Sequence, residues 1–441
     1  MDKPSGRVLS AWEVYAGFGA DTLAGLAEAA SYPLIARGGE ISAAIKGRCD
    51  DLGVKSIALA QSDARFEARE VDEIVENKKM VKARTLTRVA ETLAMDDFRL
   101  GAQPRGGGDT GLAYRLRDLM RSETRTTGVM TPSVVLALTE AAWVIRTQIR
   151  LLQWQKGKAS GIPNLLRDLQ TPLGTKLRPS WREGYALAQK TREILGIGPE
   201  EPIRNLPEIV EKKCNIPVIQ CEIAGRFVGA TISNNGDRGI ALNVIGSGSN
   251  VFSRRMTLAH ELAHLLCDPD EELRFLRVDT DNILHHTDSV FEDFIEARAN
   301  AFAVEFLAPQ QAVLKKFREG GSSQEAMAHL MDYFGISLTA LGWQLQNADR
   351  VNIRRSELPK PTRFEPSDEW LVDTGRTADY FPVASTPVVR TGYFAKHVAQ
   401  AALANIISFD TASEYLKMQH DEELPAEPEI RPLLEKVSEL Y

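Results

Sequence analysis

The sequence predicts a mostly helical α+β protein with one small sheet that contains antiparallel strands. Apolar residues recur with helical spacing over much of the chain, most clearly at 132–154, 255–266 and 291–307. A strong hairpin signal, the turn Asn-Asn-Gly-Asp at 234–237, separates two short alternating segments. A glycine-rich stretch at 101–111 reads as a flexible linker and marks a domain boundary.

The length of 441 residues allows about three domains. A helix at 132–154 has an apolar face and is expected to dock on the domain that follows it. We therefore predict a helical, helix-turn-helix-like domain at 1–105, a linker with docking helices at 106–178, a sheet-containing domain at 179–350 and a helical and irregular region at 351–441.

Composition and charge limit the classes of function. The chain is 43% hydrophobic and 26% charged, as is typical of globular proteins, and its net charge of −7 provides no overall basic field for nucleic acid. The first residues lack the apolar segment of a signal peptide, and no apolar run has the length of a membrane span. The four cysteines are sparse and irregularly spaced, which is typical of free thiols. We expect a cytoplasmic protein that does not associate with membranes.

The N-terminal region is expected to fold as short helices joined by tight turns. The segments I-K-G-R-C-D-D-L-G-V-K-S-I-A-L-A-Q (45–61) and L-T-R-V-A-E-T-L-A-M-D-D-F-R-L (86–100) resemble XRE/Cro-type DNA-binding domains. The predicted helices span 41–52, 56–61, 64–77 and 82–94.

The charge of this region leaves two interpretations open. The third helix, the expected reader of the major groove, is rich in acids that repel phosphates. Basic residues follow it, and Lys78, Lys79, Lys82 and Arg84 are the candidate nucleic-acid contacts. The region is therefore either a DNA-binding domain or a protein-docking module that keeps the helix-turn-helix shape.

A metal-binding motif lies in the apolar helical run at 255–266. Its sequence His260-Glu261-Leu262-Ala263-His264 places two imidazoles at positions i and i+4, on one face of a helix. Zinc held by His260 and His264 would lower the pKa of a bound water, whose proton the neighbouring Glu261 can accept. This pattern is typical of metal-dependent peptidases.

A catalytic zinc site needs a third protein ligand. The helix predicted at 291–307 carries two candidates one turn apart, Glu292 and Glu296. Asn300 lies one further turn along and could hold a ligand histidine by its second ring nitrogen. We expect one zinc ion per chain, although the same donors also suit manganese.

These motifs resemble the ImmA/IrrE family of zinc metallopeptidases, a gluzincin-like group. The resemblance rests on M-T-L-A-H-E-L-A-H-L-L and E-A-R-A-N-A-F-A-V-E-F-L-A-P, and extends over about 181–346. It implies that His260, His264 and Glu296 bind zinc and that Glu261 is the general base. Two family positions differ, because Ala263 replaces a usual glycine and Arg298 replaces a frequent acid.

Kinship also implies a function, a zinc endopeptidase that cleaves a repressor-like regulator in stress responses or in mobile-element and defence control. An open strand edge in the predicted hairpin is expected to pair with an extended substrate. His285 or His286, in an acidic loop predicted at 268–288, is a candidate oxyanion donor. Cys267, near the motif, is a candidate inhibitory thiolate, or simply a buried residue.

The alternative is a DNA-binding transcriptional regulator whose metal domain senses or scaffolds without turnover. The intact Glu261 weighs against it. The C-terminal region, with helices predicted at 392–407 and 409–418, shows no second catalytic pattern.

Overall fold

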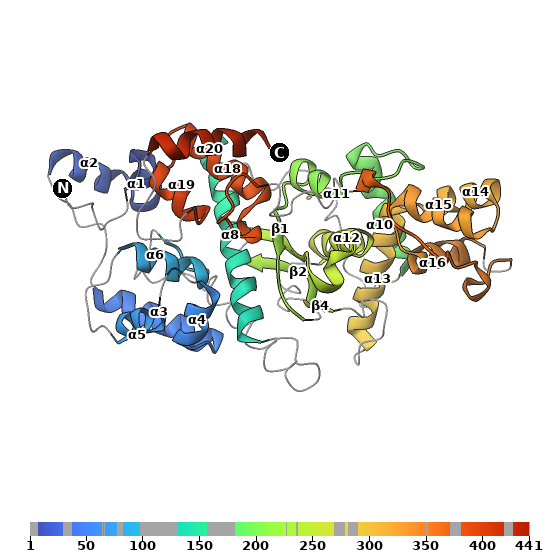
Figure 1. Cartoon of the computed structure of the whole chain (residues 1–441), viewed down its shortest axis with the longest axis horizontal. Helices are drawn as coiled ribbons and strands as arrows, with labels where there is room; N and C mark the ends of the chain where they lie inside the picture. Colours follow the sequence, from blue (N-terminus) through green and yellow to red (C-terminus); the bar gives the residue numbers. More distant parts are fainter. Residues whose placement is uncertain are drawn as a thin grey trace.

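A small sheet sandwiched between two helices forms the centre of the molecule (Figure 1). The computed structural model describes residues 8–29, 38–63, 65, 67–76, 83–97, 131–156, 181–225, 227–234, 237–268, 278–280, 290–349, 352–370, 381–418 and 427–440. Helices dominate and the sheet is mixed, which confirms the predicted mostly helical α+β class. Among these described residues, no helix is long and apolar enough to cross a bilayer.

The sheet has the strand order β1-β3-β2-β4. Strands β2 (Phe227–Asn234) and β3 (Asp237–Asn243) form the predicted antiparallel hairpin, with Asn234 opposite Asp237. Strand β1 (Val218–Cys221) runs parallel to β3 on the other side. Strand β4 (Val278–Thr280) pairs antiparallel with the outer edge of β2.

Two helices cover the two faces of this sheet. Because side chains alternate along a strand, Ile240 and Leu242 of β3 point into one core while Ala241 points into the other. Helix α12 (Val251–Cys267) packs on the first face and α8 (Pro132–Lys156) on the second. The predicted docking helix therefore does dock on the next domain, close enough that a Cβ on Gly239 would lie 2.6 Å from Ile145 Cδ1.

The second metal-site helix is fixed by close packing. Helix α13 (Val290–Leu307) lies against both α12 and α10 (Trp181–Leu195). Gly184 of α10 allows this, because a Cβ there would collide with the α13 backbone at Arg298 O and lie 2.8 Å from Phe302 N. Helices α14 (Gln310–Gly320), α15 (Gln324–Phe334) and α16 (Leu338–Ala348) continue the same core.

The connector after α16 is anchored on α12 by one aromatic side chain. Trp370, at the end of the 3-10 turn η4 (Asp368–Trp370), is 1% exposed. Its ring lies 4.2 Å from the Arg255 guanidinium, and its indole donates to Asp332 O at 2.9 Å. This segment, predicted as irregular, therefore closes one side of the core around the motif helix.

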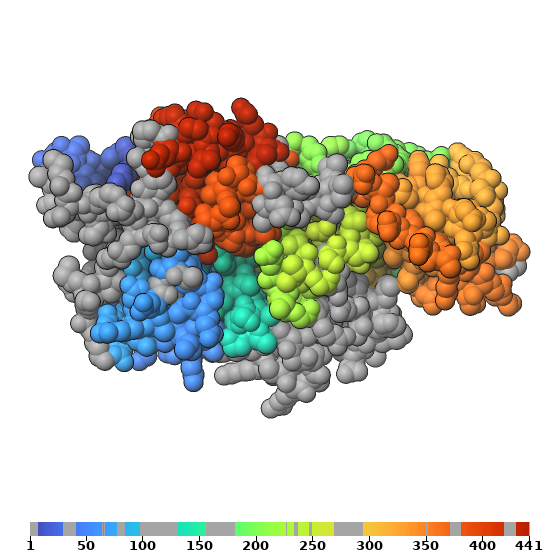
Figure 2. Space-filling model, viewed as in Figure 1, coloured from blue at the N-terminus to red at the C-terminus, as the bar shows by residue number. Residues whose placement is uncertain are grey.

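The N-terminal and C-terminal helices share one hydrophobic core with α8 and the outer face of the sheet. Figure 2 shows the blue N-terminal and red C-terminal segments at the same end of the molecule. The remaining elements are α1 (Ala11–Phe18), α2 (Ala20–Glu28), α3 (Gly38–Leu52), α4 (Ser56–Ser62), α5 (Ala68–Val75), α6 (Ala83–Thr92), α11 (Leu206–Glu208), the π-turn η1 (Ile209–Lys213), the 3-10 turns η2 (Gly246–Ser249), η3 (Arg355–Glu357) and η6 (Val388–Arg390), α18 (Gly392–Leu403), α19 (Phe409–Tyr415) and α20 (Glu427–Glu439).

Buried ion pairs join these two ends of the chain. Arg65 lies 2.7 Å from Asp63 and 3.3 Å from Glu414 of α19. Arg88 of α6 lies 3.1 Å from Glu414, and Arg84 lies 2.9 Å from Asp410. Since each acid is at most 9% exposed, these pairs fasten the N-terminal helices to the C-terminal region.

One sequence-based expectation is wrong, and one helix was not predicted. The segment 268–288 was expected to be only a loop, yet it contributes β4, so β2 is not an edge strand. Local sequence could not show this, because β4 forms only where β2 offers its backbone donors and acceptors. The proline-containing tail forms α20, with Pro432 inside the helix, because Ile430, Leu434 and Val437 are buried in the core.

Candidate metal centre

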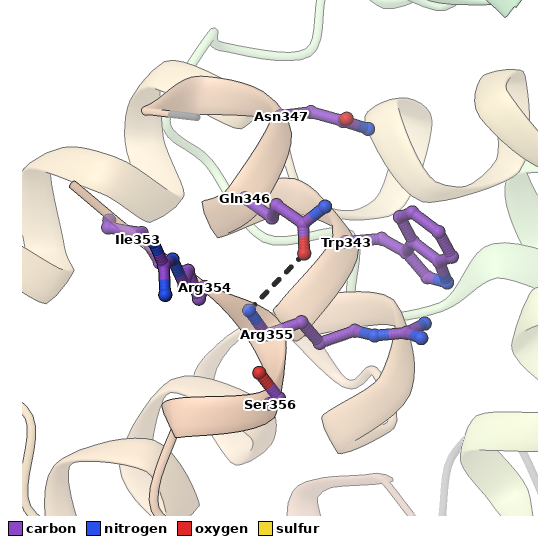
Figure 3. A pocket seen from close by; sticks show the side chains of 7 residues that line it. All are labelled: Trp343, Gln346, Asn347, Ile353, Arg354, Arg355 and Ser356. Carbon is purple, nitrogen blue, oxygen red and sulfur yellow. Dashed lines mark hydrogen bonds between the residues drawn. The ribbon is translucent and has the colours of Figure 1, made fainter. Parts of the chain in front are cut away.

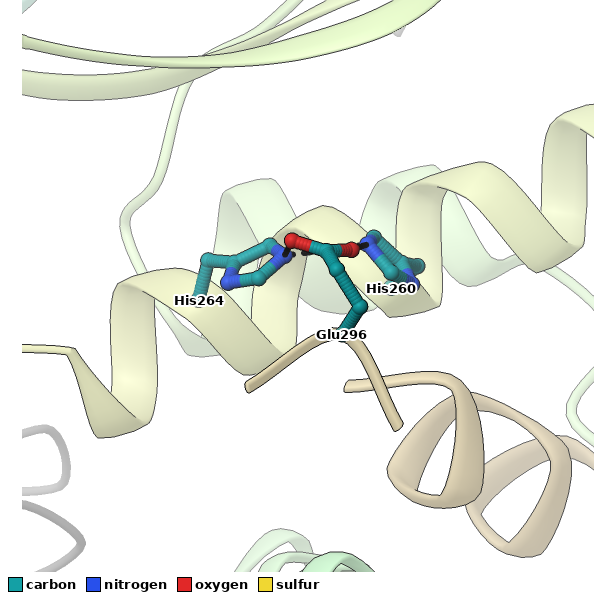
Figure 4. Close-up of side chains that lie close together, drawn as sticks. All are labelled: His260, His264 and Glu296. Carbon is teal, nitrogen blue, oxygen red and sulfur yellow. Dashed lines mark hydrogen bonds and ion pairs between the residues drawn. The ribbon is translucent and has the colours of Figure 1, made fainter. Parts of the chain in front are cut away.

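Helix α12 carries the two histidines of the motif on one face. Asn250 caps the helix, and its side chain accepts hydrogen bonds from the backbone amides of Phe252 and Ser253 at 2.9 and 3.1 Å. His260 and His264 are fully buried side chains that point toward Glu296 of α13 (Figure 4). The three residues come from two helices and converge on one point.

The separations between their ligand atoms suit a zinc ion. His260 Nε2 lies 2.9 Å from His264 Nε2 and 3.1 Å from Glu296 Oε2, and His264 Nε2 lies 3.7 Å from Glu296 Oε1. Ligands at about 2.0–2.1 Å from a tetrahedral zinc lie about 3.3 Å apart. Among the described residues, this group meets the geometry of a metal site.

Both histidines are held by their second ring nitrogen. His260 Nδ1 lies 3.0 Å from Asn300 Oδ1. The sequence predicted that Asn300 could hold a ligand histidine but did not indicate which of the two histidines it would hold. His264 Nδ1 lies 2.7 Å from Asp268 Oδ2. These acceptors favour the tautomer with hydrogen on Nδ1, which leaves each Nε2 lone pair for a metal.

Asp268 is a residue that the sequence analysis missed. It is the C-cap of α12, is 5% exposed, and also accepts a hydrogen bond from Arg298 of α13. Its spacing of four residues from His264 was a signal for this role. Arg298, noted only as a departure from the family pattern, thus balances the buried carboxylate and ties the two metal helices together.

The carboxylate of Glu261 contacts the sheet. The hydroxyl of Thr231 on β2 lies 2.5 Å from Glu261 Oε2 and 3.2 Å from its main-chain oxygen. Gly229, two residues earlier, lets β2 pass over α12, because a Cβ there would collide with Thr257 and lie 3.5 Å from Glu261 Oε1. Strand β2 therefore runs beside the candidate general base.

Comparison with known families agrees with this geometry. Residues 242–345 match the model of the IrrE N-terminal-like domain, a peptidase family. The segment 242–345 is thus similar to the IrrE N-terminal-like domain of this family. The match spans α12 to α16 and confirms the resemblance to the ImmA/IrrE family. None of the curated proteins matches the chain.

Four further residues were considered for this site from the sequence. Cys267 does not belong to the candidate ligand set, and burial raises the pKa of its thiol to about 12, which favours the thiol over the thiolate. His285 and His286 lie outside the described residues, as does the side chain of the rival ligand Glu292.

The candidate nucleic-acid contacts are distant in sequence from the peptidase domain. Lys78, Lys79 and Lys82 lie outside the described residues. Arg84 is 16% exposed and pairs with Asp410, so its charge is engaged inside the molecule. The helices of the N-terminal region are present, whereas its DNA-binding character stays a prediction.

A separate hollow of about 450 Å³ lies beside α16. Trp343 and Arg355 flank it, with the guanidinium 4.2 Å from the ring, and Gln346 accepts from the Arg355 backbone amide at 3.2 Å (Figure 3). None of its lining residues belongs to the candidate ligand group of the peptidase domain.

Proposed function

We propose that this protein is a zinc-dependent endopeptidase that cleaves a specific, repressor-like regulatory protein in a stress, mobile-element or defence response. One observation carries the proposal. Two imidazole nitrogens and a carboxylate converge within 3.7 Å, beside a glutamate that a strand hydroxyl holds in place. The match to a peptidase family supports the reaction class, and kinship with ImmA/IrrE proteins motivates the substrate class.

The roles of the residues follow from their contacts. A zinc ion bound by these donors supplies Lewis acidity toward the attacking water and the scissile carbonyl. His260 and His264 offer Nε2 because Asn300 and Asp268 engage Nδ1.

Proton transfer is assigned to Glu261. Its carboxylate accepts a proton from the attacking water as the new C–O bond forms. It then delivers that proton to the leaving amine as the peptide C–N bond breaks. Thr231 keeps the carboxylate beside β2 during both transfers.

The regulator alternative receives less support. Arg65, in the expected DNA-reading helix, and Arg84 and Arg88, in the helix that follows it, all pair with acids of this chain. Glu67 and Glu76, the two cap residues of α5, and Asp72 within it are exposed acids that would repel phosphates.

The test is a survey of new protein N-termini in the native host, with and without DNA damage, comparing the wild-type chain with Glu261→Gln. We expect a new terminus only where Glu261 is intact. Both purified proteins should hold about one zinc per chain, which serves as the control for folding of the site. Identical termini in the two strains, or a wild-type protein that binds no metal, would contradict the proposal.

A further inference from the structure

The outer edge of β2 is already occupied by the chain itself. Strand β4 pairs antiparallel with β2, with Thr280 opposite Phe227, Asp279 opposite Gly229 and Val278 opposite Ala230 (Figure 1). The register shifts between Phe227 and Gly229. The backbone hydrogen-bonding groups that β2 could offer to an added strand at this place are therefore used by β4.

This part of β2 also adjoins the candidate general base. Gly229 lies so close to Glu261 that a Cβ on it would be 3.5 Å from Oε1, and Thr231 contacts Oε2 at 2.5 Å. An extended polypeptide whose scissile bond reaches Glu261 has to pass along the same strand. Since a strand edge accepts one partner at a time, β4 and such a polypeptide compete for it.

The chain connectivity strengthens this competition. Strand β4 lies between the end of α12 at Cys267 and the start of α13 at Val290, so both of its connections lead to metal-site helices. A tethered segment has a high effective concentration at its own site. With three paired residues and an irregular register, β4 is nevertheless short enough for a longer strand to replace it.

We propose that β4 is an internal pseudosubstrate strand that blocks the substrate edge of β2. It must leave before an extended segment of the protein substrate can pair with Phe227–Ala230. The effect of β4 on substrate binding rests on the proposed peptidase function. The displacement of β4 from β2 can be measured without metal.

The first experiment tests the pairing in the metal-free, full-length protein. Asp279→Pro removes a backbone donor in the middle of β4, whereas the matched control Asp279→Ala keeps it. Amide exchange over 227–230 should become about tenfold faster in the proline variant and stay unchanged in the alanine variant. Equal exchange in all three proteins would overturn the inference, whatever the metal site does.

The second experiment locks the strand. Ala230 and Val278 are directly opposite, a spacing that suits a disulfide, so Ala230→Cys/Val278→Cys can be closed by oxidation and reopened by reduction. The probes on the zinc-loaded chain are a tetrapeptide hydroxamate, which needs the strand edge, and acetohydroxamate, which does not. Each single cysteine variant, treated with the same oxidant, is the control.

The two probes separate the two proposals. Oxidation should weaken tetrapeptide hydroxamate binding at least about tenfold and leave acetohydroxamate binding unchanged. Equal tetrapeptide binding in the oxidised and reduced states would overturn the role of β4. Failure of acetohydroxamate to bind any form would instead contradict the proposed metal site, and amide exchange would still decide whether β4 holds the edge.

Discussion

Replacing Asp268 with asparagine should weaken metal binding while the protein stays folded. The carboxylate serves two donors, His264 Nδ1 at 2.7 Å and the Arg298 guanidinium, and is 5% exposed. An amide offers one oxygen, so its nitrogen must face one of these donors. If the nitrogen faces His264, it favours the tautomer that carries hydrogen on Nε2, the atom required for the metal. If it faces Arg298, a buried cation loses its acceptor.

The expected magnitude follows from these two losses. Removing an outer partner of a ligand histidine typically lowers metal affinity by about 10–100-fold. Leaving a buried donor unsatisfied costs about 1–3 kcal/mol of folding free energy. Competition with a chromophoric chelator at constant pH measures the first effect, and chemical denaturation of the metal-free protein measures the second.

A matched control is available at the other end of the molecule. Asp410 is also a largely buried carboxylate that accepts from an arginine, Arg84, and from a second donor, the Val8 amide. Asp410→Asn should therefore reduce stability but leave metal affinity unchanged. A folded Asp268→Asn protein that binds zinc within about twofold of the wild type would refute the reasoning, because the effect expected from an outer partner is at least about tenfold.

Three further predictions follow. Thr231→Val should slow cleavage of the identified substrate about tenfold or more without changing zinc affinity, because Glu261 loses a charged hydrogen bond. Thr231→Ser keeps the hydroxyl and should restore the rate. Equal cleavage rates for Thr231→Val and the wild type would contradict this prediction. Gly184→Ala should lower the free energy of unfolding, measured by chemical denaturation, by about 1–3 kcal/mol and should also lower zinc affinity, because the added Cβ collides with the α13 backbone. The control Gly47→Ala should not destabilise the protein, because a Cβ there meets no atom within 4 Å. A Gly184→Ala protein as stable as the wild type would count against this prediction. Burial alone would raise the pKa of Glu140, but Lys417 and Arg390 lower it from 4.5 to about 2. The ionised carboxylate therefore contributes about 3 kcal/mol to the free energy of unfolding above pH 4.5, and this contribution is lost as the pH falls toward 2. The difference in unfolding free energy between wild type and Glu140→Gln should therefore shrink across this range, and a constant difference would show that Glu140 does not carry it.

The fold class and most element positions could be predicted because they depend on local patterns. The spacing of apolar residues in α8 and α12 and the turn between β2 and β3 are readable within a few residues. The elements that were missed, β4 and α20, depend on partners far away in sequence. Strand β4 needs the edge of β2, and α20 tolerates Pro432 because its apolar face is buried in the shared core.

The same division holds for the candidate site. By itself, the sequence determined that His260, Glu261 and His264 lie on one helix, because the apolar residues around them recur with helical spacing. It also determined that the two histidines face the same way, because they are four residues apart. Only the tertiary structure decided the rest. It brings Glu296 to the histidines, Thr231 to Glu261 and Arg298 to Asp268, because contacts between distant segments are set by packing, which no local pattern records.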